Sequence, residues 1–250
     1  MSTKNTIYSL ILQNREKDKK QLAVLLDPDK QQIEAIPALV RTIAENGADF
    51  IFVGGSLMVK PDFEVKLLAI KLSSSIPVII FPGNPLQINK NADGLLLLSL
   101  ISGRNPELLI GQHVIAAPSI KSSGLEILST GYILVDCGKA TTASYISNSM
   151  PVPFDKPEIA ACTALAGEQL GFKLIYLDGG SGAVMPISLE MINQTKESIA
   201  LPLIVGGGIK TPEQALIACK AGADIIVVGT AFEDNLSSLK PIAEIIKNSK

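Results

Sequence analysis

Eight short apolar runs, spread along the whole chain, constrain its fold more than any other feature. Each run is five to seven residues long: 22–27, 49–54, 77–81, 94–100, 131–137, 173–178, 201–206 and 223–229. Continuous runs rich in Val, Ile and Leu are typical of strands that are buried on both faces of a parallel sheet. The sequence therefore predicts eight buried strands.

Helical patterns occupy most of the intervals between these runs, as at residues 33–46, 157–170 and 211–221. Several begin with Thr or Pro, as helix starts do. Eight strand-helix units predict an α/β fold, a single (β/α)8 TIM barrel over residues 1–250, and a doubly wound open sheet is the alternative. Residues 1–20 have only a short apolar run followed by basic residues, the reverse of a secretory signal. We predict a capping helix there.

One interval breaks the pattern. About a dozen residues separate the third and fourth runs, and they include Pro82, Gly83 and Pro85. Because two prolines and a glycine disfavour a helix, the third crossover helix is predicted to be missing or vestigial. A barrel without one outer helix has a breach in its wall, where a long apolar ligand could bind. The gap alone favours the simpler reading, a shortened loop.

Composition excludes several classes of protein. The chain has three cysteines without a C-x-x-C spacing and one histidine, which disfavours a disulfide framework or a zinc site. A net charge of −2 without a basic run argues against a nucleic-acid partner. No apolar stretch approaches the roughly 18 residues that span a bilayer. We expect a soluble, cytoplasmic protein, and an anionic small molecule remains open as its substrate.

Two glycine loops near the end of the chain carry the strongest chemical signal. They follow the seventh and eighth apolar runs, where barrels commonly bind phosphate. Glycines let backbone N–H groups approach an oxygen anion closely. The sequence predicts a phosphate site at Gly207, Gly208, Gly229 and Thr230.

Oxygen donors end the first two apolar runs. Asp27 follows the first run, at the mouth of the predicted barrel, where a carboxylate can bind Mg²⁺ or act as a base. Ser56 follows the second run and is a candidate for a second metal ligand or a diphosphate donor. A helix N-cap is an equally good reading of Ser56.

Tyr176 and Asp178 end the sixth run and share one strand face, because side chains alternate along a strand. Both are predicted to point into the barrel mouth. A buried acid beside a phenol is costly without a partner or a role, which favours a catalytic function. Gly179, Gly180, Ser181 and Gly182 follow, and they would wrap a small polar substrate.

Taken together, these residues resemble the geranylgeranylglyceryl phosphate synthase family, which includes bacterial heptaprenylglyceryl phosphate synthases. The shared motifs include Leu26-Asp27-Pro28-Asp29-Lys30, Val53-Gly54-Gly55-Ser56, Phe81-Pro82-Gly83-Asn84, Phe154-Asp155-Lys156-Pro157 and Tyr176-Leu177-Asp178-Gly179-Gly180-Ser181-Gly182. The likeness covers nearly the whole chain. The tyrosine-containing loop and the Pro157 segment are specific, whereas many barrels share the glycine loops.

The resemblance implies a magnesium-dependent prenyltransferase. It would join geranylgeranyl diphosphate to sn-glycerol 1-phosphate and release diphosphate, a step of ether-lipid synthesis. It further implies Mg²⁺ at Asp27 and Ser56. For such a transfer we expect Asp178 and Tyr176 to be catalytic, with Asp178 stabilising the allylic cation and accepting the hydroxyl proton and Tyr176 orienting the acceptor. The implied glycerol phosphate site comprises Tyr176, Leu177, Asp178, Gly179, Gly180, Ser181, Gly182, Gly207, Gly208, Gly229 and Thr230. We also expect a homo-oligomer and peripheral membrane contact during product release.

Two positions depart from the family pattern. Asp178 stands where the family commonly carries Glu, so its carboxylate reaches one methylene less far. Leu25 stands where the heptaprenyl branch carries Lys. The longer loop from Tyr176 to Gly182 resembles the archaeal-type branch and favours a geranylgeranyl donor. Its apolar tail is predicted to leave through the breach, near Leu100 or Ile101.

Two other functions stay open. A sugar-phosphate isomerase of the histidine-biosynthesis type has acids at the ends of strands one and five, here Asp27 and Asp136. A non-catalytic carrier of a prenyl lipid or of phosphate is the second. Mg²⁺ dependence, diphosphate release and turnover distinguish these alternatives from the transferase.

Overall fold

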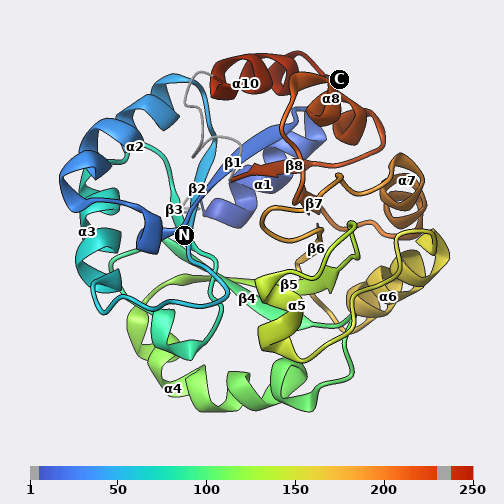
Figure 1. Cartoon of the computed structure of the whole chain (residues 1–250), viewed down its shortest axis with the longest axis horizontal. Coiled ribbons are helices and arrows are strands. Elements are labelled where there is room, and N and C mark those ends of the chain that lie inside the picture. The colour runs from blue at the N-terminus through green and yellow to red at the C-terminus, as the bar shows by residue number, and fades with distance from the viewer. Residues whose placement is uncertain (1–5, 230–237, 250) are drawn as a thin grey trace, which may run out of the picture.

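The computed structural model describes residues 6–229 and 238–249. Eight parallel strands pair in chain order and close into a barrel, so the predicted (β/α)8 fold is confirmed (Figure 1). The strands are β1 (Gln21–Leu26), β2 (Phe50–Val53), β3 (Val78–Ile80), β4 (Gly94–Leu100), β5 (Glu126–Leu134), β6 (Leu174–Asp178), β7 (Leu203–Gly206) and β8 (Ile225–Val228).

Helices lie around the barrel, except α1, which lies at the amino ends of the strands (Figure 1). They are α1 (Ile7–Glu16), α2 (Ile36–Glu45), α3 (Phe63–Ser73), α4 (Gln112–Ser123), α5 (Thr142–Ser147), α6 (Pro157–Gln169), α7 (Leu189–Ser198), α8 (Pro212–Lys220) and α10 (Leu239–Asn248). Local sequence sets where a helix begins, as at α8. There Thr211 and Gln214 form a reciprocal capping box, and Pro212 occupies the first turn. Within the described ranges, no helix is long and apolar enough to cross a membrane.

Side-chain alternation along the strands produces two apolar cores. One fills the barrel interior and includes Phe50, Phe52 and Leu96. The other lies between the strands and the helices, where Ile51 and Val53 pack. Because both faces of each strand are buried, the strands appear in the sequence as continuous apolar runs.

α1 lies at the amino ends of the strands. Ile7 and Ile11 belong to the interior core. The carboxylate of Glu126, the first residue of β5, accepts hydrogen bonds of 2.6 and 2.9 Å from the backbone N–H groups of Ile7 and Tyr8. α1 therefore contributes apolar side chains to the end of the barrel at which the strands begin.

The interval between β3 and β4 contains a single 3₁₀ turn, η3 (Pro85–Gln87), so the predicted loss of the third crossover helix is confirmed. The buried Gln87 amide donates 2.9 Å to the Gly55 carbonyl and accepts 3.1 Å from the Gly83 N–H. A Cβ on Gly83 would lie 2.3 Å from the same carbonyl oxygen. The segment thus packs closely against the loop after β2.

β5 begins five residues earlier than the apolar pattern predicts, at Glu126 instead of Gly131. Three of the five early residues are polar but bonded: the Glu126 carboxylate to α1, and Ser129 as acceptor for the Lys173 N–H at 3.2 Å. Thr130 donates 2.8 Å to the Leu128 carbonyl. A hydrophobicity pattern does not detect strand residues whose polar groups find partners in the tertiary structure.

Candidate active site

The carboxyl ends of the strands surround a polar pocket of about 250 Å³. Most of the predicted site residues line it: Asp27, Ser56, Tyr176, Asp178, Gly180, Ser181, Gly182, Gly207, Gly208 and Gly229. Leu177 belongs to the core between strands and helices, because strand alternation turns it away from its two neighbours. Gly179 packs against the Cys137 side chain. Thr230 lies outside the described residues.

Asp178 is buried at the end of β6, and both of its oxygens are bonded. The Tyr132 hydroxyl donates 2.5 Å to Oδ2, and the Gly180 N–H donates 2.7 Å to Oδ1. Burial raises the pKa of Asp178, while the two hydrogen bonds favour the carboxylate and oppose that rise. The carboxylate is thereby held in one orientation at the pocket wall.

Tyr132 is a functional candidate that the sequence analysis missed. It pairs with Tyr176 across β5 and β6, and their ring centroids are 5.5 Å apart in an edge-on arrangement. The Phe81 ring lies 5.9 Å from Tyr132 and 5.5 Å from Tyr176. Period-two alternation along β5, the argument that identified Tyr176, would also have placed Tyr132 inside the barrel.

Burial also acts on the two phenols. The pKa values of Tyr132 and Tyr176 are raised well above the ordinary tyrosine value, first because of burial and second because of the neighbouring Asp178 charge. Both hydroxyls stay protonated at neutral pH. Tyr132 is therefore a hydrogen-bond donor to the carboxylate.

Asp27 begins the turn η1 (Pro28–Lys30), where its Oδ1 accepts 3.0 Å from the Asp29 N–H. Its Oδ2 faces the Lys30 amine at 3.9 Å. Ser56 lines the same pocket and is not a helix N-cap, because α3 begins at Phe63 and Asp62 precedes it. This side of the pocket thus offers the Asp27 carboxylate and the Ser56 hydroxyl from neighbouring loops.

Over residues 6–229 and 238–249, no three His, Cys, Asp or Glu side chains form a metal-binding cluster. This part of the chain therefore lacks the cluster of three or more such side chains that is typical of a zinc site. Magnesium is different, because it is commonly held by one or two carboxylates together with substrate phosphates and water. Asp27 and Ser56 fit that kind of donor set.

Both glycine loops line the pocket, but they differ in whether the backbone conformation and the space around it require glycine. Gly207 and Gly208 have φ angles of +83° and +76°, and a Cβ on Gly208 would lie 2.5 Å from the Met185 carbonyl oxygen. Both positions require glycine for the fold itself. At Gly229 a Cβ would lie 3.6 Å from Leu25, an ordinary contact. Lys30 and Lys210, which the sequence analysis did not single out, add positive charge to the pocket lining.

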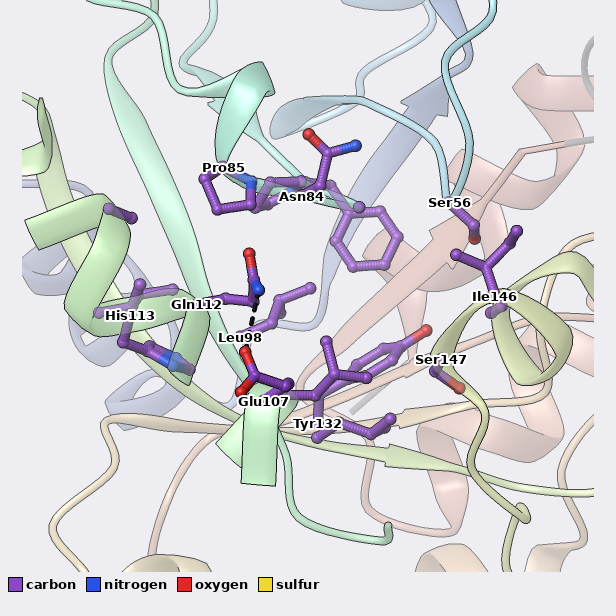
Figure 2. Close-up of a pocket in the computed structure, with 18 of the residues that line it drawn as sticks. Ser56, Asn84, Pro85, Leu98, Glu107, Gln112, His113, Tyr132, Ile146 and Ser147 are labelled. Carbon is purple, nitrogen blue, oxygen red and sulfur yellow. Dashed lines mark hydrogen bonds between the residues drawn. The ribbon is translucent and has the colours of Figure 1, made fainter. Parts of the chain in front are cut away.

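An apolar cavity of about 330 Å³ adjoins the polar pocket. Figure 2 shows side chains that line it, among them Leu98, His113 and Tyr132. The cavity extends from Phe81 and Tyr132 past β4 toward α4 and η3, over the breach in the barrel wall. Its apolar lining includes Ile88, Leu95, Leu97, Leu98, Leu100, Leu108 and Ala116. The two cavities share Ser56, Phe81, Tyr132 and Ala143 as lining residues.

Ile101, the second residue predicted near the tail, lies elsewhere. Its Cδ1 sits 2.8 and 2.9 Å from the positions that a Cβ would take on Gly131 and Gly167, between β5 and α6. Asp136 is exposed, and its Oδ1 accepts 3.1 Å from the Gly138 N–H within its own turn. Since Asp136 lines neither cavity, the structure does not bring together the acid pair of the isomerase alternative.

Known proteins are similar to this chain over nearly its full length. The chain is 54% identical over 229 residues to a geranylgeranylglyceryl phosphate synthase of Spirosoma linguale, covering 92% of each chain. It is 50% identical over 242 residues to the enzyme so named in Chitinophaga pinensis, covering 97% of this chain and 96% of that one.

The fold matches a crystal structure of (S)-3-O-geranylgeranylglyceryl phosphate synthase from Thermoplasma acidophilum in complex with its substrate sn-glycerol-1-phosphate. The TM-score is 0.92 at 32% identity, over 97% of this chain and 99% of that chain. The model of the PcrB family matches residues 14–248. A family match over nearly the full length, on a barrel with this pair of adjoining cavities, shows that the chain belongs to the PcrB family.

Proposed function

We propose that this protein is a geranylgeranylglyceryl phosphate synthase, which transfers the geranylgeranyl group from its diphosphate to sn-glycerol 1-phosphate. The names of relatives at 50% and 54% identity and the substrate bound in the Thermoplasma acidophilum structure support this assignment. The bond from the allylic carbon to the diphosphate oxygen breaks. A new ether bond forms to a glycerol hydroxyl, whose proton is lost.

The observation that carries the proposal is the junction between the two cavities. A polar pocket with glycine loops suits a phosphate, and an apolar cavity of about 330 Å³ suits a long hydrocarbon chain. The cavities meet at Ser56, Phe81 and Tyr132, where the reacting carbon and the acceptor hydroxyl would lie together. An isomerase acting on a sugar phosphate would not need the apolar cavity, because its substrate has no long hydrocarbon chain.

We assign the diphosphate end of the donor to the side of the pocket formed by Asp27 and Ser56. Mg²⁺ held there would neutralise charge on the leaving diphosphate. Lys30 lines the same side and adds further positive charge. We place the glycerol phosphate opposite, with its phosphate at Gly207, Gly208 and Gly229 and its glycerol part against Gly180 to Gly182.

Asp178 is the proposed proton acceptor. Its raised pKa brings a carboxylate closer to the range in which a general base is effective. Its buried negative charge would also stabilise the positive charge that develops on the allyl group. Tyr176 would orient the acceptor. The aromatic faces of Tyr132 and Phe81, at the junction of the cavities, would attract the same developing cation.

The proposal is tested with radiolabelled sn-glycerol 1-phosphate, prenyl diphosphates of different lengths and Mg²⁺, followed by extraction into organic solvent. We expect label in the organic phase in multiple turnovers, one diphosphate released per product, and loss of both on removing Mg²⁺ with a chelator. Binding of one equivalent without product would instead identify a carrier. Turnover that does not require the prenyl donor would identify another enzyme.

A further inference from the structure

The metal-side residues of the pocket lie on two separate loops. Asp27 follows β1, and Ser56 follows β2. A pair of ligands on different loops binds a metal well only if the loops keep a fixed spacing. Asp27 is oriented by its own turn, since its Oδ1 accepts from the Asp29 N–H. The contacts between this turn and the chain that follows the β2 loop involve residues outside the pocket lining.

Three contacts join the Pro28–Lys30 turn to the segment that follows Ser56. Asp29 Oδ2 accepts 2.6 Å from the Val59 N–H. The Lys60 amine donates to the Asp29 carbonyl. The Lys66 amine, from α3, donates 2.8 Å to the Pro28 carbonyl. These bonds connect the residues directly after Asp27 to the chain that carries Ser56.

Lys66 is the unusual member of this group. It is 3% exposed, and its amine also pairs with Asp62 Oδ2 at 2.9 Å. A buried lysine is rare, because desolvating an ammonium group is costly unless strong partners compensate. Here one of the two partners is the carbonyl oxygen of Pro28, the residue that follows Asp27. Neither Lys66 nor Asp29 lines either cavity.

From these contacts we infer that Lys66 and Asp29 are positioning residues for the magnesium and diphosphate site. They act through Asp27 and do not touch substrate. The inference rests on the proposed function, because it presupposes Mg²⁺ at Asp27. Loss of such outer partners typically weakens metal affinity by about 10- to 100-fold while the ligands themselves remain.

Lys66→Met tests this inference, with Lys71→Met as the matched control. Lys71 lies on the same helix and pairs with Asp93 at 2.8 Å, at the amino ends of β3 and β4, away from the pocket. Both variants lose one lysine and one ion pair. Each is titrated calorimetrically with MgCl₂ in the presence of inorganic pyrophosphate, and with sn-glycerol 1-phosphate alone.

For Lys66→Met we expect magnesium-pyrophosphate affinity to fall about tenfold or more, with unchanged glycerol phosphate affinity and near-normal turnover at saturating Mg²⁺. Lys71→Met should match the wild type in both affinities and in turnover. Wild-type magnesium affinity in Lys66→Met, or an equal loss in both variants, overturns the inference.

Asp29 provides a second route if Lys66→Met does not fold. Asp29→Ala removes the acceptor for the Val59 N–H and should weaken magnesium-pyrophosphate binding, whereas Asp29→Asn keeps an oxygen there and should retain most of it. Equal loss in both overturns the role of this hydrogen bond. Asp27→Asn separates the two levels: if it leaves magnesium-pyrophosphate binding intact, the proposed metal site itself is wrong.

Discussion

The Tyr132 hydroxyl and the Asp178 carboxylate, on the adjacent strands β5 and β6, are joined by a 2.5 Å hydrogen bond inside the barrel mouth. The bond favours the charged carboxylate, against burial, which favours the neutral acid. In Tyr132→Phe one of the two hydrogen bonds that oppose burial is lost and only that from the Gly180 N–H remains, so the pKa of Asp178 rises further. The acidic limb of the kcat–pH profile should therefore move to higher pH.

Profiles of kcat against pH for wild type and Tyr132→Phe check this expectation. Tyr145→Phe is the control. Tyr145 is 83% exposed on α5, so this substitution also removes a phenolic hydroxyl, but from the surface. An acidic limb that stays in place or moves to lower pH in Tyr132→Phe would contradict Asp178 as the titrating base.

Asp178→Asn should lower the rate of the chemical step by roughly 10²-fold or more, since it removes the proposed proton acceptor and its charge. The affinity for glycerol phosphate should change little. Single-turnover kinetics and direct titration separate the two. A loss confined to the Michaelis constant would make Asp178 a binding residue only.

The same substitution has a stability consequence of defined sign. The pKa of Asp178 is raised in the folded state, so between the unfolded and folded pKa values the native state binds more protons than the unfolded one. Wild-type stability therefore decreases as pH rises through that window. Asp178→Asn lacks this decrease, and its melting temperature relative to wild type should be higher at pH 8 than at pH 4.

Asp27→Asn should nearly abolish transfer while the protein stays folded. The amide keeps an oxygen for the Asp29 N–H, so the turn remains, but a neutral oxygen is a much weaker ligand for Mg²⁺. Turnover is measured across a Mg²⁺ series, with circular dichroism as the folding control. A near-normal rate at limiting Mg²⁺ would refute the metal assignment.

Gly229→Ala should weaken glycerol phosphate binding by roughly tenfold to a hundredfold, because a methyl group in the pocket wall hinders backbone contact with the phosphate. The fold tolerates it, since the new Cβ makes only an ordinary contact with Leu25. Titration with each substrate gives the result, and donor affinity should be retained. Equal losses for donor and acceptor would argue against a separate acceptor phosphate site.

Gly208→Val is a poorer probe of the same site than the sequence alone suggests. Its Cβ would lie 2.5 Å from the Met185 carbonyl oxygen in a left-handed backbone conformation. We expect this variant to lose stability as well as affinity, so melting temperatures must accompany its titrations.

Ala116→Phe should shorten the accepted donor. Ala116 is buried on α4 and lines the apolar cavity, but it is not among the residues that the two cavities share. A ring there blocks the far end, so kcat/KM for the geranylgeranyl donor should fall roughly tenfold or more relative to the farnesyl donor. Ala117→Phe is the matched control, because Ala117 is exposed on the same helix. An unchanged ratio in Ala116→Phe would exclude this route for the tail.

The sequence by itself determined the barrel, the missing third crossover helix and most of the polar pocket. Strands buried on both faces must be continuously apolar, and Pro82, Gly83 and Pro85 cannot sustain a helix. Residues at strand ends are brought to one rim by the topology alone. For this reason the sequence alone brings Asp27, Ser56 and Asp178 to one pocket.

Only the tertiary structure decided which groups touch. Tyr132 bonds Asp178 across two strands that are 46 residues apart at these positions, a relation set by strand register and not by local pattern. Lys66 reaches back from α3 to the Pro28 carbonyl, and Gln87 reaches from η3 to the Gly55 carbonyl. Side-chain hydrogen bonds between distant segments leave no periodic signal, because each depends on how two packed elements are oriented and not on the sequence around either partner.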